Sequence, residues 1–158
     1  MNRIPALLAV IAISIGFAAR TNAADAAPNA APSAPMLGAV GIGVKDLAVS
    51  TRFYSDVLGM KVLRRFELGY LNEVVMGFPD SPGASVVLMN WPGDATRRYD
   101  GNDVKLVFYV HDPAQIIELI RKNGGKIDRE AKPIEALNGT VVGLGRDPDN
   151  YVIELLAR

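Results

Sequence analysis

The side chains that most often perform chemistry in proteins are sparse in this sequence. It contains no cysteine and one histidine, His111. The absence of cysteine excludes disulfide bonds, thiolate metal ligands and a lipid-modified cysteine. His111 ends an apolar strand pattern beside a helix-cap sequence, where a structural or surface histidine is the usual interpretation. Polar chemistry therefore depends on carboxylate, lysine and arginine side chains, and the single tryptophan, Trp91, could stack on a planar ligand.

An internal repeat with an offset of 66 residues organises the region that must position these side chains. In each copy a valine ends an apolar strand, an aspartate two residues later can cap a helix, and a glycine introduces the next strand. The matched pairs are Val44 with Val110, Asp46 with Asp112, and Gly59 with Gly125. The two halves of the domain are therefore predicted to be copies of one unit.

Each copy is predicted to contain a strand, a helix and three further strands. In the first copy, the strands are expected at 37–44, 60–66, 69–77 and 84–90, with a helix after Asp46. In the second copy, the strands are expected at 103–110, 126–131, 139–145 and 151–157, and the capping sequence 112–115 begins the helix. The pattern predicts an α+β domain in which two βαβββ repeats form one curved mixed sheet around a central pocket.

The amino-terminal region indicates export. A short positive start is followed by the apolar run 4–19 and by small residues up to Ala23, which predicts a signal peptide over 1–23. A membrane anchor is the alternative, but the run is shorter than the ~20 residues that usually span a bilayer. Residues 24–36 are rich in alanine and proline and predict a flexible linker, so the folded domain is 37–158. The expected location is periplasmic or secreted, with no membrane contact after cleavage.

The charge of the mature protein excludes one class of partner. Removal of Arg3 and Arg20 with the signal peptide leaves 15 basic residues against 17 acidic ones. This balance predicts no binding to nucleic acid or to an anionic membrane surface.

Two segments resemble a known family. Residues 44–65 (VKDLAVSTRFYSDVLGMKVLRR) resemble the first helix and second strand of the vicinal oxygen chelate superfamily, which includes glyoxalases, bleomycin-resistance proteins and extradiol dioxygenases. Residues 146–158 (RDPDNYVIELLAR) resemble its closing turn and last strand. The resemblance implies a glyoxalase-like fold. It also implies that metal-dependent members carry four ligands, commonly His or Glu, on the first and fourth strands of each half, and that the metal acts as a Lewis acid.

Most of the metal-ligand positions that the resemblance implies are filled by residues that cannot bind a metal. The position on the last strand falls on Glu154, and the repeat offset carries it back to Leu88, or to Val87 if the register shifts by one. The first-strand positions fall on Ala39 and Lys105. One carboxylate is too few for a tight divalent site, where three or four protein ligands are usual. We therefore expect no cofactor, disfavour a divalent metal, and treat Glu154 as the single retained ligand position.

The two polar residues at these positions could act together. Because Lys105 and Glu154 occupy equivalent places in the second half, we predict that they form an ion pair in the vacated site. The alternative is that Lys105 extends to solvent and Glu154 is an isolated polar residue. In the loop that joins the halves, Arg97 and Arg98 are interpreted as part of a solvated connector. The favoured alternative for Trp91 is a rim residue that packs on its own domain or on a dimer partner.

Three functions remain open at this point. The first is an exported, glyoxalase-like binding domain that holds a small organic molecule between its repeats, with Trp91, Asn90, Leu88 and Ala39 as the ligand-binding residues. The second is a metal-independent lyase or isomerase that uses Glu154 as a general base and Lys105 to stabilise an oxyanion. The third is a metal-dependent enzyme of the lactoylglutathione lyase or dioxygenase type, completed by a partner chain. A small-molecule partner is expected in each case, and the exposed strands permit a homodimer.

Overall fold

The computed structural model describes residues 37–81, 83–99 and 103–158. The predicted signal peptide (1–23) and linker (24–36) lie outside the described residues. The first repeat comprises β1 (Ala39–Gly43), α1 (Leu47–Asp56), β2 (Lys61–Glu67), β3 (Asn72–Gly77) and β4 (Ser85–Asn90). The second comprises β5 (Lys105–Val110), α2 (Pro113–Lys122), β6 (Ile127–Ile134), a short 3-10 helix (Glu135–Leu137), β7 (Thr140–Arg146) and β8 (Val152–Ala157). The predicted α+β class and the two βαβββ repeats are confirmed.

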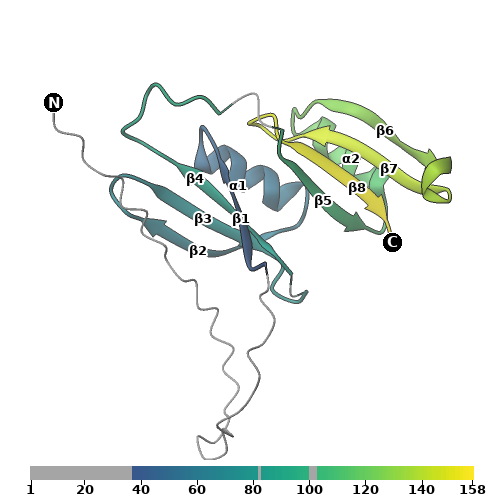
Figure 1. Ribbon diagram of the computed structural model, residues 1–158, viewed down its shortest axis with the longest axis horizontal. Helices are drawn as coiled ribbons and strands as arrows, with labels where there is room; N and C mark the ends of the chain where they lie inside the picture. The colour runs from purple at the N-terminus through teal and green to yellow at the C-terminus, as the bar shows by residue number, and fades with distance from the viewer. Residues whose placement is uncertain (1–36, 82, 100–102) are drawn as a thin grey trace, which may run out of the picture. The chain divides into compact units, whose positions relative to one another are not determined.

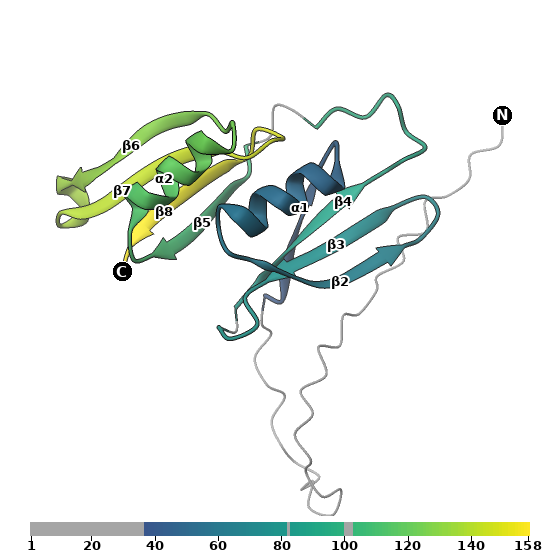
Figure 2. The same cartoon turned by 180° about the vertical axis from the view of Figure 1, so that it is seen from behind.

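The strands form two four-stranded mixed sheets, with the orders β1-β4-β3-β2 and β5-β8-β7-β6. In each sheet the first and last strands of the repeat are parallel neighbours, and the remaining pairs are antiparallel. Figures 1 and 2 show one helix against each sheet, α1 on the first and α2 on the second. The prediction of one continuous curved sheet is therefore wrong in this respect: among the described residues no ladder of hydrogen bonds joins the two sheets, and side-chain contacts connect the repeats instead.

The helix ends follow from local chemistry. The Asp46 carboxylate accepts hydrogen bonds from the backbone N–H groups of Ala48 and Val49, and the Asp112 carboxylate accepts one from Gln115. These contacts satisfy amide groups that have no partner within the helix. At the end of α2, Gly124 takes a positive φ of 78°, which a side chain would disfavour.

A single apolar core draws on both repeats. Phe53 and Tyr54 of α1 and Ile117 and Ile120 of α2 are buried against the sheets. Ile120 approaches β7 closely, because a Cβ atom added to Gly145 would lie 2.7 Å from its Cδ1. Within the described residues, no helix has the length and apolar character needed to cross a bilayer.

Candidate functional site

The strand register decides which residues occupy equivalent places in the two repeats. Gly41 of β1 is paired with Val87 of β4, and Val107 of β5 is paired with Glu154 of β8. Gly41 and Val107 are repeat mates, so the counterpart of Glu154 is Val87. The assignment to Leu88 from the repeat offset is corrected, because the second repeat has one residue more between the paired positions.

The same register places Leu88 on the core side of its sheet. Its side chain is fully buried and belongs to the apolar core. Side chains alternate between the two faces of a strand, and the core residues Ile153 and Leu155 flank Glu154. Glu154 therefore lies on the face of the second sheet that is turned away from α2.

Lys105 and Glu154 form the predicted ion pair. The Lys105 Nζ atom lies 2.6 Å from the Glu154 Oε2 atom. The Glu154 side chain is 18% exposed and that of Lys105 is 49% exposed, so the pair lies at a partly solvated edge of the sheet. The ammonium group neutralises the single carboxylate at the four positions that the family resemblance assigns to metal ligands.

These positions do not fit a divalent metal. The residues there are Ala39, Val87, Lys105 and Glu154, which together supply one carboxylate. That carboxylate is paired with the Lys105 ammonium group, which has no lone pair to offer a metal. In the part of the chain that the structure describes, no three His, Cys, Asp or Glu side chains gather as a metal site would require. The donor chemistry is thus that of an ion pair.

The turn between β7 and β8 docks onto the first repeat through Asp149. Its carboxylate accepts a 2.8 Å hydrogen bond from the backbone N–H of Lys45 and another of 2.8 Å from the Ser50 hydroxyl. Lys45 and Ser50 flank the start of α1, more than ninety residues away in sequence. This contact fixes the beginning of α1 against the end of the second repeat.

Asp147 makes the second polar contact between the repeats. Its carboxylate accepts hydrogen bonds from the N–H groups of Tyr151 and Asp149, at 2.8 and 3.0 Å, and from the Tyr54 hydroxyl at 2.9 Å. Burial raises the pKa of Asp147 from its ordinary 3.8 to about 6, although the hydrogen bonds from Tyr151 and Tyr54 lower it. Burial, together with the Asp147 carboxylate, also holds the pKa of Tyr54 well above its usual value.

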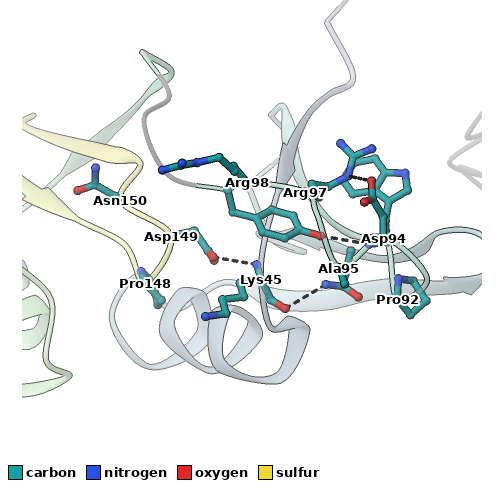
Figure 3. A pocket seen from close by; sticks show the side chains of 12 residues that line it. Lys45, Pro92, Asp94, Ala95, Arg97, Arg98, Pro148, Asp149 and Asn150 are labelled. Carbon is teal, nitrogen blue, oxygen red and sulfur yellow. Dashed lines mark hydrogen bonds and ion pairs between the residues drawn. The ribbon is translucent and has the colours of Figure 1, made fainter.

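Beside this junction lies a cavity of about 680 Å³, which is lined by both repeats and by the loop that connects them (Figure 3). Its lining residues are Lys45, Asn90, Trp91, Pro92, Asp94, Ala95, Arg97, Arg98, Tyr99, Pro148, Asp149 and Asn150. We call it the junction pocket. Two of the predicted ligand-binding residues, Asn90 and Trp91, line it, whereas Ala39 and Leu88 do not.

One of the two loop arginines, Arg97, makes specific contacts within the loop. The Arg97 Cζ atom lies 3.8 Å from the centre of the Trp91 ring, and its Nε atom lies 3.5 Å from the Asp94 Oδ2 atom. Asp94 is held in turn by hydrogen bonds from the backbone N–H and the hydroxyl of Thr96. Trp91 thus packs on its own loop, as the alternative interpretation proposed, and also lines the pocket.

Asn90 holds its place through backbone contacts. Its side-chain amide donates 3.0 Å hydrogen bonds to the carbonyl oxygens of Val44 and Lys45. The sequence had not singled out Lys45, Asp149 or Asn150 as site residues. The only available signal was the 146–150 turn, which was recognised as a family motif without a role for its side chains.

The single histidine lies elsewhere. His111 lines a second cavity of about 670 Å³, together with Phe78, Tyr109 and Arg158. This cavity contains neither Lys105 nor Glu154.

Two βαβββ repeats joined at a buried polar junction define a glyoxalase-like α+β domain. The family model for the Glyoxalase/Bleomycin resistance protein/Dioxygenase superfamily matches residues 36–155, and the chain belongs to this superfamily.

The relatives of this chain include lactoylglutathione lyases. The chain is 38% identical over 119 residues to the lactoylglutathione lyase of Salmonella typhimurium, a match that covers 72% of this chain and 85% of the relative. It is 35% identical over 121 residues to the lactoylglutathione lyase of Neisseria meningitidis serogroup A, covering 73% of this chain and 85% of that protein.

Solved structures agree on the fold. The trypanothione-dependent glyoxalase I of Leishmania major has a TM-score of 0.65 and 30% identity, covering 79% of this chain and 87% of that one. Glyoxalase I from Zea mays has a TM-score of 0.66 and 29% identity, but this chain spans only 44% of its length.

Proposed function

We propose that this protein is a small-molecule-binding member of the superfamily, and that its ligand occupies the junction pocket. The observation that carries the proposal is the cavity of about 680 Å³ lined from both repeats, with Asn90 and Trp91 in its wall. Its volume lies within the range of pockets that hold small organic ligands. The polar contacts of Asp147 and Asp149 beside it support a wall that is formed before a ligand binds.

The Lys105–Glu154 ion pair supports binding without metal chemistry at the family's ligand positions. A divalent ion would have to displace the ammonium group from the one carboxylate present and find its other ligands elsewhere. Exchange of repeats between two copies would bring together the same residue types, so a partner chain of this sequence adds no His or Glu at these positions.

The binding proposal is tested by a thermal-shift screen of metabolites and divalent metals on purified protein lacking residues 1–23, since a ligand that binds only the native state raises the melting temperature. We expect a stabilising metabolite whose effect is lost in Trp91→Ala and retained in Tyr70→Ala, a matched change at an aromatic residue that is 57% exposed and outside the pocket. A stoichiometric metal in the purified protein would contradict the proposal.

A second candidate is a metal-independent lyase, supported by the names of the relatives and by the close contact between Lys105 and Glu154. In that case Glu154 acts as general base and Lys105 stabilises an oxyanion. The test is turnover of S-lactoylglutathione by the wild type and by Glu154→Gln, with Glu67→Gln on β2 as a control. Turnover that requires Glu154 would favour the enzyme over the binding protein.

We also propose that the protein is exported and that its signal peptide is cleaved near Ala23 or Ala24. The supporting observation is the positive start and apolar run of residues 1–23 in the sequence. The measurement is the mass of the protein recovered from the periplasmic fraction or the medium. Recovery of the uncleaved chain from the membrane fraction would support an anchor instead.

A further inference from the structure

The junction pocket contains an arginine, Arg97, whose guanidinium is only partly engaged by the protein. The Arg97 guanidinium stacks on Trp91 with its Nε turned toward Asp94, and within the described residues it donates no hydrogen bond. Stacking and the Asp94 contact restrict a side chain that would otherwise sample many rotamers. A guanidinium held in this way is prepared to receive a planar anion through its N–H groups.

The two carboxylates that line the pocket already have partners within the protein, and Asp94 is paired with the Nε edge of Arg97. Asp149 is only 9% exposed, and its two carboxylate oxygens accept hydrogen bonds from the Lys45 amide and the Ser50 hydroxyl. Asp94 accepts from Thr96 and faces Arg97. Both acidic groups of the wall are thus already satisfied by protein donors.

Further positive charge lies on the same wall. Lys45 immediately precedes the N-cap of α1, and no ion pair joins its ammonium group to a residue that the structure describes. Figure 3 shows the Arg98 side chain extending toward Asn150, so cationic groups flank the pocket from the connecting loop as well.

Aromatic surface accompanies the charge. Trp91 and Tyr99 both line the pocket, and both pack against Gly43, where a Cβ atom would lie 3.3 Å from Tyr99 and 3.4 Å from Trp91. These short distances show that both rings lie close to the backbone of β1, beside the cationic groups of the pocket.

We propose that the ligand of the junction pocket is a planar organic acid, whose carboxylate is bound by the Arg97 guanidinium with support from Lys45 and whose ring lies against Trp91 and Tyr99. This inference rests on the proposed function, because it names the class of ligand for the same pocket. Two carboxylate oxygens match the fork of N–H groups that a guanidinium presents.

The test uses the single tryptophan of the chain as the reporter. Trp91 emission is excited at a wavelength that benzoate does not absorb, and the protein is titrated with benzoate, with its neutral analogue benzamide and with phenyl phosphate. We expect saturable binding of benzoate that weakens with added salt, benzamide binding about tenfold weaker or more, and no advantage for phenyl phosphate.

Variants at Arg97 test whether its guanidinium binds the carboxylate of the ligand. Arg97→Gln should weaken benzoate binding about tenfold or more while changing benzamide binding by less than about twofold, and Arg97→Lys should recover only part of the loss because it keeps the charge without the fork. Arg65→Gln, at an exposed arginine of β2 outside the pocket, should change neither affinity. Thermal melting of each variant establishes that it is folded.

The outcomes separate this inference from the proposed function. Equal binding of benzoate and benzamide, or benzoate binding that survives Arg97→Gln, would overturn the organic-acid ligand while leaving the pocket as a binding site. Phenyl phosphate binding far more tightly than benzoate would overturn the choice of a carboxylate. No binding of benzoate would also overturn the inference. The proposed function fails on other results: a metabolite screen that finds no ligand dependent on Trp91, or a stoichiometric metal in the purified protein.

Discussion

Asp147 should make the stability of the domain fall as the pH rises from 4 to above 6. Its carboxyl group is 4% exposed, and burial raises its pKa from 3.8 to about 6. A group whose pKa is higher in the folded state binds its proton more tightly there. Its contribution to stability is therefore complete below pH 3.8 and is lost as the pH rises through 6.

The magnitude follows from the size of the shift. One pKa unit corresponds to about 1.4 kcal/mol, so a shift from 3.8 to about 6 corresponds to about 3 kcal/mol. This is a large fraction of the stability of a typical domain, which is about 5–15 kcal/mol. The change is confined to the window between the two pKa values.

Asp147→Asn is the matching perturbation. The asparagine oxygen can accept from the amides of Tyr151 and Asp149, and its NH₂ group can donate to the Tyr54 hydroxyl oxygen, so the variant imitates the protonated acid. We therefore compare the free energy of unfolding of the variant with that of the wild type at each pH. The difference, variant minus wild type, should increase by about 3 kcal/mol between pH 4 and pH 7.5.

The assay is urea unfolding at several pH values, followed by Trp91 fluorescence and by circular dichroism. Asp56→Asn, at an exposed carboxylate of α1, serves as the control and should follow the wild-type profile. A difference between Asp147→Asn and wild type that is flat with pH, or that falls as the pH rises, would refute the reasoning. It would mean that the three donated hydrogen bonds outweigh burial.

Three further changes test other parts of the structure. Tyr151→Phe removes a hydroxyl that accepts a hydrogen bond from the Gly43 N–H and donates one to the Gly43 carbonyl, each at 3.0 Å. It should lower the free energy of unfolding, measured by urea titration, by about 1–3 kcal/mol. The control Tyr109→Phe, at an exposed tyrosine, should change it by less than about 0.5 kcal/mol. Ile120→Ala opens a cavity at a fully buried site and should cost about 2–5 kcal/mol; a smaller loss would show that the core closes around it. Lys105→Met breaks an ion pair whose lysine is half exposed, so its cost in calorimetry should stay below about 1 kcal/mol, and a larger loss would indicate that Glu154 depends on its partner.

Much of the local structure could be predicted from the sequence, because it depends on contacts between residues close in the chain. Asp46 and Asp112 cap helices through amides two or three residues away, and Gly124 ends α2 through its own backbone conformation. Such signals need no knowledge of the rest of the fold. The pairing of Lys105 with Glu154 was also predictable, since the family pattern places them on the first and last strands of one repeat, and these strands are parallel neighbours.

Other features depended on distant parts of the chain and were decided only by tertiary structure. The counterpart of Glu154 is Val87 and not Leu88, because the second repeat has one additional residue between the paired positions. A shift of one residue moves a side chain to the opposite face of a sheet. The separation into two sheets is set by which strand edges find partners, which no local pattern specifies.

The junction pocket is the clearest case of this division. The sequence by itself determined the family, the repeated units and a tryptophan near the end of β4. It could not show that Asp149 would reach across to Lys45, or that Arg97 would stack on Trp91. The first contact joins segments that meet only when both repeats pack into one core, and the second depends on the conformation of the loop between the repeats. Together they arrange the cationic and aromatic side chains around the pocket.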